Sequence, residues 1–455
     1  MHAKKTGVTR RDFVGGAAAA LAGFTIVPGH VLTARGATGP NEKLNIACIG
    51  VGGRGADNVN EVGGQNIVAL CDVDEGRLGE AMKKHPAAMP FRDFRKLLDE
   101  MEKSIDAVVV ATPDHTHAVA AMAAIKRGKH VYCEKPLAHS VYEIRQLMKA
   151  AREHKVITQL GNQGHSFDSI RTFCEWVWDG AIGQVHTIHA ACNAPNSAMG
   201  QLSRVNEDHP VPATLDWDLW LGPAQLRKYN PMYAPSRWRS WSPFGTGTSG
   251  DWICHVVDPV FWALDLGSPL TIQAQAKNFD PKVHGDTFPR GCIIKYVFPA
   301  KGNRGPVTLH WYTGNEQMPR PEGLEPGRTV PETGAIVLGD SGGITYGSHG
   351  AGGVRVFPET KMRAYQEKLK TSKPARTLPR VKGHHQDWLT AIRTGGKAGS
   401  DFSYGGPLTE VALLGAIGLR MLGMELKWDA GNMRFTNSDE ANQFLNPPYR
   451  NGWTL

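Results

Sequence analysis

Lys135, Asp251 and His255 have the types and spacing that acid–base chemistry needs. Lys135 follows the apolar run HVYC in the stretch HVYCEKPLAHS, where Pro136 stops ladder hydrogen bonding and a buried lysine would be costly. We therefore expect a strand to end just before this lysine. Asp251 and His255 are four positions apart in GDWICHVVDPVFWAL, so a helix would carry both on one face. A histidine, with an unperturbed pKa of about 6.5, can exchange protons near neutral pH.

Each of these residues also has a simpler interpretation. Lys135 alone fits a surface lysine on a strand-to-helix loop, and His255 alone fits a structural hydrogen-bonding residue. His384 and His385 open an amphipathic helix in VKGHHQDWLTAIRTG; one of them could reach a substrate cleft, but capping or packing is favoured. No metal is predicted, because no recognised zinc spacing is present among the candidate ligands His115, His117, His165, His384, His385, Asp114 and Asp251.

A glycine-rich turn follows the first apolar strand, which runs from Leu44 to Ile49. Gly50, Gly52 and Gly55 come next in the order G-x-G-x-x-G, which serves a tight turn, close approach of a pyrophosphate and close helix packing. Asp72 ends the second strand, 22 positions after Gly50. Its carboxylate can accept hydrogen bonds from ribose hydroxyls and would repel a 2′-phosphate. The pattern predicts bound NAD rather than NADP, unless Asp72 is only a turn residue before a helix.

The elements around these residues form two different patterns. Strands alternate with helices up to about residue 165, which predicts an α/β Rossmann fold with a doubly wound parallel sheet. Beyond it come one helix and several strands with alternating side chains, which predict an α+β domain with a largely antiparallel sheet. A length of 455 residues agrees with two domains. Within the second domain, the connecting segment 193–250 is long and rich in Pro, Trp and Arg, which is typical of a functional loop.

Three stretches together resemble one family of oxidoreductases. The glycine turn, ATPDHTHAVAAMAAIKRGKHVYCEKPLA and GDWICHVVDPVFWAL are similar to the glucose-fructose oxidoreductase and inositol dehydrogenase family, Gfo/Idh/MocA, from about residue 43 onward. The resemblance implies that Lys135 binds the substrate hydroxyl and the nicotinamide ribose, that His255 takes the proton and that Asp251 orients the sugar. Ser249 and Ile253 depart from the apolar residue and glycine of many relatives, which leaves the local helix geometry open.

The resemblance also implies two sets of binding residues. The predicted cofactor contacts are Gly50, Gly52, Gly53, Arg54, Gly55, Asp72, Thr112, Pro113, His117, Glu134 and Lys135. The predicted substrate contacts are Lys135, Asn162, Arg237, Trp238, Asp251 and His255. Tryptophans gather in the long loop, and flat aromatic faces bind the C–H faces of a pyranose ring, although about half of these tryptophans are expected in the core.

The family pattern also sets the expected domain organisation. We expect a signal segment at 1–36, the NAD-binding domain at 42–165, a substrate-binding and oligomerisation domain at 166–430 and a tail at 431–455. The second sheet should be open-faced, because few helices are predicted between 265 and 360 to cover it. Apolar alternation in GCIIKYVF and VTLHWY then favours a homodimer or homotetramer paired through this face.

The N-terminus has the composition of an export signal. Arg10 and Arg11 stand before a short apolar run in the pattern TRRDF, which predicts twin-arginine export to the periplasm, with the Tat export machinery as a partner. Cleavage is expected after Gly36, although an uncleaved amphipathic anchor remains an alternative. Removal lowers the formal net charge from +8 to +4, and no basic run with interleaved aromatics remains, so no nucleic-acid partner is predicted. Seven cysteines without a CxxC pair predict buried thiols.

Export restricts the expected chemistry, because free NAD is scarce outside the cytoplasm. A secreted dehydrogenase must keep its cofactor tightly bound and have it re-oxidised in place by a second substrate. The main expectation is therefore an oxidoreductase acting on a secondary hydroxyl of a sugar, glycoside or polyol. One alternative is an NAD-dependent glycoside hydrolase that oxidises C3 transiently, eliminates the aglycone and returns the hydride. A second alternative is a non-catalytic sugar-binding protein.

Overall fold

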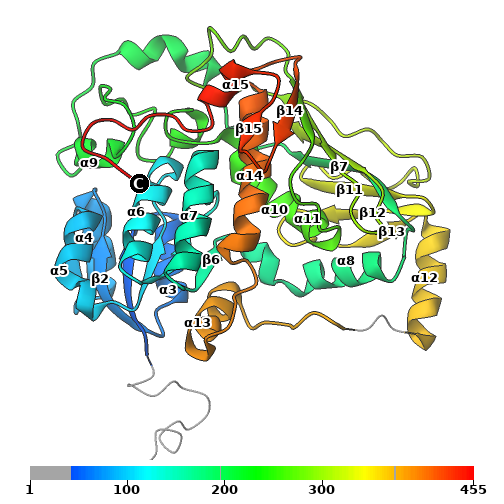
Figure 1. Cartoon of the computed structure of the whole chain (residues 1–455), viewed down its shortest axis with the longest axis horizontal. Helices are drawn as coiled ribbons and strands as arrows, with labels where there is room; N and C mark the ends of the chain where they lie inside the picture. Colours follow the sequence, from blue (N-terminus) through cyan, green and yellow to red (C-terminus); the bar gives the residue numbers. More distant parts are fainter. Residues whose placement is uncertain (1–42, 195, 373–375) are drawn as a thin grey trace, which may run out of the picture.

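The chain folds around two β-sheets with a long helix between them (Figure 1). The computed structural model describes residues 43–194, 196–372 and 376–455, so the predicted export signal lies outside the described residues. The central helix is α14 (Phe402–Gly418), which packs against α7 (Val141–Glu153) on one side and α10 (Gly247–Val256) on the other. Within the described residues, no helix is long and apolar enough to cross a membrane.

The first sheet is entirely parallel and has the strand order β3-β2-β1-β4-β5-β6. Its strands are β1 (Asn45–Ile49), β2 (Asn66–Cys71), β3 (Met89–Phe91), β4 (Ala107–Val110), β5 (His130–Cys133) and β6 (Thr158–Leu160). Ile49 is in register with Cys71 and with Val110, and Val110 with Cys133, so the carboxyl ends of four strands meet at one edge. In such a sheet ligands bind beyond this edge. The predicted Rossmann architecture is confirmed.

Helices cover both faces of this sheet, and one of them comes from late in the chain. They are α3 (Arg54–Glu61), α4 (Glu75–Lys84), α5 (Phe94–Met101), η2 (Glu102–Ser104), α6 (Asp114–Lys126), α7 and α13 (His384–Thr394). Trp388 and Leu389 of α13 join Tyr132 in the core of the first sheet. The C-terminal residues also return to this domain, where the Lys126 Nζ donates to the Leu455 carbonyl at 2.9 Å. The first domain therefore includes residues beyond 165.

The second sheet is mixed and largely antiparallel, with the order β13-β12-β11-β7-β10-β9-β8-β14-β15. Among the described strands of this sheet, only β7 and β10 pair in parallel. Its strands are β7 (Val185–Cys192), β8 (Thr271–Gln275), β9 (Cys292–Phe298), β10 (Val307–Thr313), β11 (Gly334–Gly339), β12 (Gly342–Gly347), β13 (Arg355–Phe357), β14 (Glu425–Asp429) and β15 (Arg434–Phe435). This sheet confirms the predicted second domain.

One face of the second sheet packs on helices and the other is partly open. The remaining elements are α8 (Asp168–Trp178), α9 (Trp217–Leu221), α11 (Asp258–Ala263), α12 (Glu359–Thr371), α15 (Asp439–Gln443), η3 (Gln163–Ser166), η4 (Met199–Asn206) and η5 (Trp238–Ser240). On the open face, Met318 and Leu324 of a long connection cover Tyr312 and Ile336. His189 and His310, which are stacked at 5.2 Å between ring centroids, are only partly buried. The sequence did not predict this partial cover.

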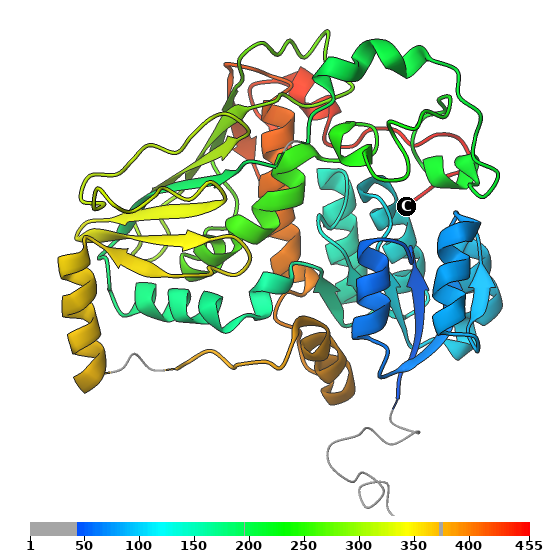
Figure 2. The ribbon, with the colours of Figure 1, turned by 180° about the vertical axis from the view of Figure 1, so that it is seen from behind.

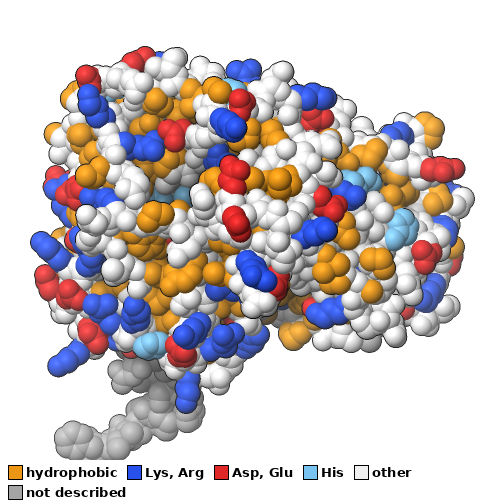
Figure 3. All heavy atoms as spheres, turned by 45° about the horizontal axis from the view of Figure 1, so that its top comes forward, with side chains coloured by type: hydrophobic (Ala, Val, Ile, Leu, Met, Phe, Trp, Pro, Cys, Tyr) orange, Lys and Arg blue, Asp and Glu red, His pale blue; other side chains and the backbone are white. Residues whose placement is uncertain are grey.

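The segment 193–246 crosses above the first domain, as both ribbon views show (Figures 1 and 2). It has its own apolar core, in which Trp220, Tyr233, Trp241 and Phe244 are buried. On the face shown in Figure 3, basic and acidic side chains are interspersed among apolar ones. All seven cysteines are buried and free, as predicted. The helix expected to carry Asp251 and His255 is α10, which ends at Val256; a new helix, α11, begins at Asp258, because Pro259 interrupts the helical hydrogen bonds.

Candidate active site

A cavity of about 550 Å³ opens beyond the carboxyl edge of the first sheet. The segment 193–246, helix α10 and the loop after β12 complete its walls. Ten predicted cofactor residues line it: Gly50, Gly52, Gly53, Arg54, Asp72, Thr112, Pro113, His117, Glu134 and Lys135. This volume lies within the range of about 300–1,000 Å³ that small-molecule and cofactor sites occupy.

The glycine turn leaves open space where a dinucleotide phosphate would lie. Gly53 has a φ of +53°, immediately precedes α3, and a Cβ atom there would meet nothing within 4 Å. A Cβ on Gly50 would lie 2.6 Å from the Ala111 carbonyl oxygen, and one on Gly55 would lie 2.0 Å from the Gly50 carbonyl oxygen. Gly55 does not line the cavity but lets α3 pack closely on β1. A helix N-terminus beside an open backbone turn fits a pyrophosphate.

Asp72 lies at the end of β2 with its carboxylate held by the backbone. Its oxygens accept hydrogen bonds from the Val51 N–H at 3.0 Å and the Asp74 N–H at 3.0 Å. Burial raises the pKa of Asp72, and the two N–H donors oppose that rise. Each carboxylate oxygen has a second lone pair, which leaves acceptors for the ribose hydroxyls. Arg77 also lines the cavity, and its side chain lies where a Cβ on Gly52 would be.

Glu134 and His117 hold the strand ends that form the cavity floor. The buried Glu134 carboxylate accepts hydrogen bonds from the Arg54 Nε at 3.2 Å and the Asn58 Nδ2 at 3.0 Å, which ties α3 to the end of β5. The His117 ring nitrogens lie 2.7 Å from the Pro136 carbonyl oxygen and 2.8 Å from that of Thr112. His117 therefore bridges the loops after β4 and β5. Because Lys135 directly precedes Pro136, this contact also fixes the position of Lys135.

Lys135 and Asp251 come together although 116 residues separate them. The Lys135 Nζ donates to the Asp251 carboxylate and, at 3.2 Å, to the Asp251 carbonyl. The same carboxylate accepts from the Arg239 Nε at 3.2 Å and from the Asn196 Nδ2 at 3.2 Å. Burial opposes ionisation, but the charges of Lys135 and Arg239 hold the pKa of Asp251 well below its usual value. The sequence pattern had not assigned Asn196 or the pairing of Arg239 with Asp251.

His255 lies one turn further along α10 and lines the cavity. Its Nδ1 atom is buried without a hydrogen-bond partner among the described residues. Burial and then the charge of Lys135 lower its pKa well below 6.5, so the imidazole is neutral at neutral pH and can accept a proton. His349, in the loop after β12, contacts it with ring centroids 4.3 Å apart and lines the same cavity. No sequence signal marked His349, since 94 positions separate the two histidines.

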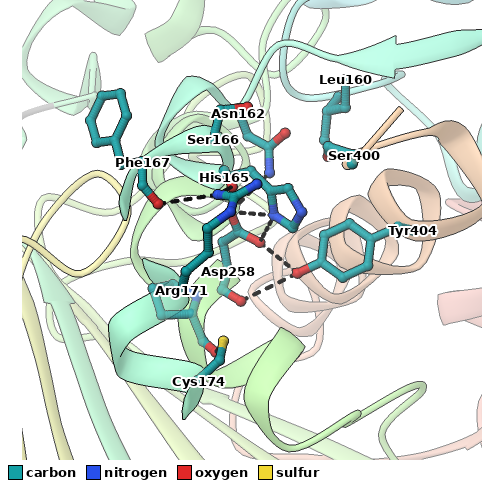
Figure 4. A network of polar contacts seen from close by, with 12 residues as sticks. Leu160, Asn162, His165, Ser166, Phe167, Arg171, Cys174, Asp258, Ser400 and Tyr404 are labelled. Atoms are coloured by element: carbon teal, nitrogen blue, oxygen red, sulfur yellow. Dashed lines mark hydrogen bonds and ion pairs between the residues drawn. The ribbon is translucent and has the colours of Figure 1, made fainter. Parts of the chain in front are cut away.

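Asn162, expected at the substrate, instead lies fully buried outside the cavity lining (Figure 4). Its Nδ2 donates to the Asp258 carboxylate at 3.1 Å. Asp258 also accepts from the His165 ring at 3.0 Å and from the Tyr404 hydroxyl. Asp258, at the start of α11, holds the Asn162 amide within this network, outside the lining of the cofactor cavity. The network joins the end of β6 to α11 and α14.

The predicted substrate residues of the long segment are divided between two clefts. Trp238 lines the cofactor cavity but is mostly buried, with the Arg239 guanidinium 4.2 Å from its ring centroid. Arg237 is exposed and lines a second cleft of about 590 Å³. Trp241 is fully buried, and Trp252 lies beside His255 with their ring centroids 5.8 Å apart. Several of the tryptophans in the long segment are therefore part of its apolar core, as expected.

The remaining histidines have structural contacts. The His384 Nε2 lies 2.6 Å from the Leu160 carbonyl oxygen, and His385 stacks on Tyr132 at 4.4 Å between centroids. Burial lowers the pKa of His384 to about 3 and that of His385 to about 4. His115 lies between the Phe244 and Trp220 carbonyls. Within residues 43–194, 196–372 and 376–455, no group of three or more His, Cys, Asp or Glu side chains could hold a metal ion.

Comparison with known proteins finds two stretches of the chain that match one family of oxidoreductases. Residues 44–162 match the Gfo/Idh/MocA oxidoreductase family, NAD-binding Rossmann fold, and residues 199–296 match the C-terminal alpha/beta domain of the same oxidoreductase family. The chain is therefore similar to this family over these two stretches, and its first domain is an NAD-binding Rossmann domain. The resemblance seen in the glycine turn and the lysine and histidine stretches is confirmed.

Individual relatives match only part of their length. The chain is 35% identical over 161 residues to inositol 2-dehydrogenase 2 of Saccharopolyspora erythraea, covering 33% of this chain and 47% of that protein. It is 31% identical over 156 residues to 2,7-anhydro-N-acetylneuraminate hydratase of Mediterraneibacter gnavus, covering 33% of this chain and 40% of that protein. The chain thus aligns with less than half of either relative.

Solved structures agree with the whole fold. The WlbA dehydrogenase of Bordetella pertussis, in complex with NADH and UDP-GlcNAcA, has a TM-score of 0.57 and 15% identity, covering 85% of this chain and 99% of that chain. The aldose-aldose oxidoreductase of Caulobacter crescentus has a TM-score of 0.54 and 16% identity, covering 85% of this chain and 100% of that chain. At these identities the likeness establishes the fold alone.

Proposed function

We propose that this protein is an NAD-dependent oxidoreductase that acts on a secondary hydroxyl of a sugar, glycoside or polyol. One observation carries the proposal: Lys135 and His255 line the cavity that the glycine turn and Asp72 also line, and Asp251 is paired with that lysine. NAD, when bound there, supplies the acceptor for the hydride. The remaining steps fall to side chains of this chain.

The proposed roles follow from the contacts of the three polar residues. Lys135 donates a hydrogen bond to the reacting hydroxyl oxygen and stabilises the negative charge that develops on it. His255, which lines the cavity, takes the hydroxyl proton at Nε2, because its Nδ1 is buried without a hydrogen-bond partner among the described residues. Asp251 holds the lysine in place and retains a lone pair on Oδ2 for a substrate hydroxyl. Helix α10 places Asp251 and His255 on one face, one turn apart.

Two measurements on the purified full chain test this function. Denatured protein should release about one equivalent of dinucleotide, because unfolding opens the cofactor cavity that lies between the two domains. NAD-loaded protein mixed with a panel of sugars, glycosides and polyols should then form NADH. An empty protein with no affinity for NAD would refute the cofactor assignment, and NAD binding without turnover or binding of any panel member would refute the carbohydrate assignment.

We further propose that the protein is exported by the twin-arginine route to the periplasm, with NAD loaded before export and retained. The support is the sequence pattern around Arg10 and Arg11, and the retention of cofactor follows from the scarcity of free NAD outside the cytoplasm. Fractionation of cells that produce the full chain, compared with an Arg10→Lys, Arg11→Lys double variant, tests this. Equal periplasmic recovery of both would contradict it.

A redox-neutral net reaction is the second candidate. A relative that matches a third of this chain is named as a hydratase, which is a reaction without net oxidation. In this variant of the chemistry the oxidised sugar loses a group by elimination and is then reduced again in the same site. An aryl glycoside separates the candidates: release of the aglycone without net NADH indicates the redox-neutral reaction, and NADH without aglycone indicates an oxidoreductase.

The open part of the second sheet supports a proposal on assembly. Ile293 of β9 and His310 of β10 lie on the face that the helices leave open and are partly buried. We propose that two copies pair through this face to form a homodimer or, with a further interface, a homotetramer. Sedimentation at micromolar concentration should show more than one copy, and a monomer would contradict the proposal.

A further inference from the structure

The second cleft, of about 590 Å³, adjoins the cofactor cavity at the Lys135 side chain. Lys135, Ser236 and Arg239 line both spaces, and Asp251 lines the second cleft. The cleft is formed by the segments 196–201 and 236–241 of the long connection. A substrate whose reacting hydroxyl lies against Lys135 would therefore extend its other groups into this cleft.

The side chains of the cleft carry more positive than negative charge. Lys135, Arg237 and Arg239 are cationic, and Asp251 is the one carboxylate among the described lining residues. That carboxylate already pairs with Lys135 and with Arg239. The Arg237 guanidinium has no ion pair or hydrogen bond within the part of the chain that the structure describes, although its backbone carbonyl accepts from the Ser240 N–H at 3.1 Å. The cleft therefore has a surplus of two positive charges by formal count.

The two arginines differ in how firmly they are held. Arg239 is fixed by the Asp251 carboxylate on one side and by the Trp238 ring, 4.2 Å away, on the other. Arg237 is exposed at the same rim. A guanidinium presents a planar fork of donors that matches a carboxylate with two parallel hydrogen bonds. The hydroxyls of a neutral sugar can accept from such a fork, but they carry no charge to offset the two cations, whereas a carboxylate does both.

We propose that the cleft binds the carboxylate of an acidic sugar, so that the substrate class is a uronic acid or a similar carboxylated glycoside. Arg237 pairs with the carboxylate, and Arg239 adds a fixed positive charge. Lys135 then meets a ring hydroxyl of the same sugar beside the cofactor cavity. This inference rests on the proposed function, since it names the substrate of the same site.

The test compares sugars that differ only in this carboxylate. NAD-loaded full-length protein is offered methyl glycosides of glucose, galactose and mannose, and the methyl glycosides of the three corresponding uronic acids. Binding is measured by calorimetry and turnover by NADH formation. At least one uronic acid should be preferred about tenfold or more over its neutral partner, since a charge-assisted hydrogen bond contributes roughly that much. Added salt should reduce the preference.

Variants identify the residue responsible. Arg237→Gln should lower the acid-to-neutral ratio of binding constants about ten- to hundredfold, and Arg237→Lys should restore part of it. Arg363→Gln, an exposed arginine of α12, is the matched control and should leave the ratio unchanged. Preference for the neutral sugars would overturn the inference and leave the proposed function standing. An acid preference that survives Arg237→Gln would place the carboxylate elsewhere, and failure of all six sugars to bind would overturn the inference, while the wider panel of sugars, glycosides and polyols decides the proposed function separately.

Discussion

Replacing Asp251 by Asn removes one negative charge from the centre of the site and preserves its shape. Two cations, Lys135 and Arg239, then lose their shared carboxylate. The Lys135 side chain is 14% exposed, so its charge cannot be fully hydrated where it lies, whereas Arg239 is 34% exposed and can turn toward water. The change should therefore destabilise the fold through the lysine more than through the arginine.

The magnitude follows from the burial of the pair. Removing one partner of a buried ion pair costs about 3–5 kcal/mol, and the partial exposure of Arg239 brings the expected cost to about 2–3 kcal/mol. Asp218→Asn is the control, because Asp218 pairs with Arg450 at 2.7 Å but its side chain is 69% exposed. Such a surface pair contributes about 0–1 kcal/mol.

The pH dependence of stability gives a second readout. The pKa of Asp251 is lower in the folded chain than in the unfolded chain, where it is about 3.9. A depressed carboxylate pKa stabilises the fold above the unfolded value and loses that contribution as the pH falls below it. The Tm difference between wild type and Asp251→Asn should thus stay constant from about pH 5 to pH 8 and shrink only in more acidic solution.

Thermal unfolding of the NAD-loaded protein is the assay, with released dinucleotide measured in parallel. Asp251→Asn should keep its cofactor, because Asp251 does not line the cofactor cavity. A variant as stable as wild type at neutral pH would refute the buried ion pair. A Tm difference that narrows near pH 6 to 7 would show that another group titrates in its place.

Four further changes separate the roles of the site residues. His255→Ala should lower kcat by about 10² to 10⁴ and retain NAD, and near-normal turnover would move the base to another residue that lines the cavity, such as His349. Burial and Lys135 depress the pKa of His255, so as the pH is lowered wild-type kcat/KM should stay constant through pH 6.5 and fall only in more acidic solution. A decline that already begins above pH 6.5 would contradict this. Lys135→Ala should lower kcat as much as His255→Ala does, and part of the lost rate should return at higher pH. A loss of rate that does not depend on pH would contradict the role of Lys135 on the reacting hydroxyl. Asp72→Ala should relax discrimination against NADP, measured by the ratio of the two binding constants, and an unchanged ratio would assign that role to another residue. His349→Ala should shift the acidic limb of the pH profile toward higher pH, since His349 also lowers the pKa of His255; an unmoved limb would assign it a packing role alone.

The sequence predicted those features that depend on local pattern and on the geometry of parallel sheets. Glycine spacing after an apolar strand, Asp72 after the next strand and Lys135 after the fifth all follow one rule, that carboxyl ends of parallel strands meet at one edge. The four-residue spacing of Asp251 and His255 placed both on one helix face without knowledge of the fold. The strand-end rule groups the glycine turn, Asp72 and Lys135 at one edge, whereas only the family resemblance implied that Asp251 and His255 join them.

Contacts between distant segments were decided by the tertiary structure. His349 reaches His255 because a turn after β12 lies beside η3, where Gly164 has no side chain to hold the turn away. Arg239 reaches Asp251 only because the long connection folds back over α10. Asn162 lies in the Asp258 network rather than at the substrate, and α13 returns to cover the first sheet. Sequence periodicity reports which face of an element is buried, but it carries no information on which distant residue packs against that face.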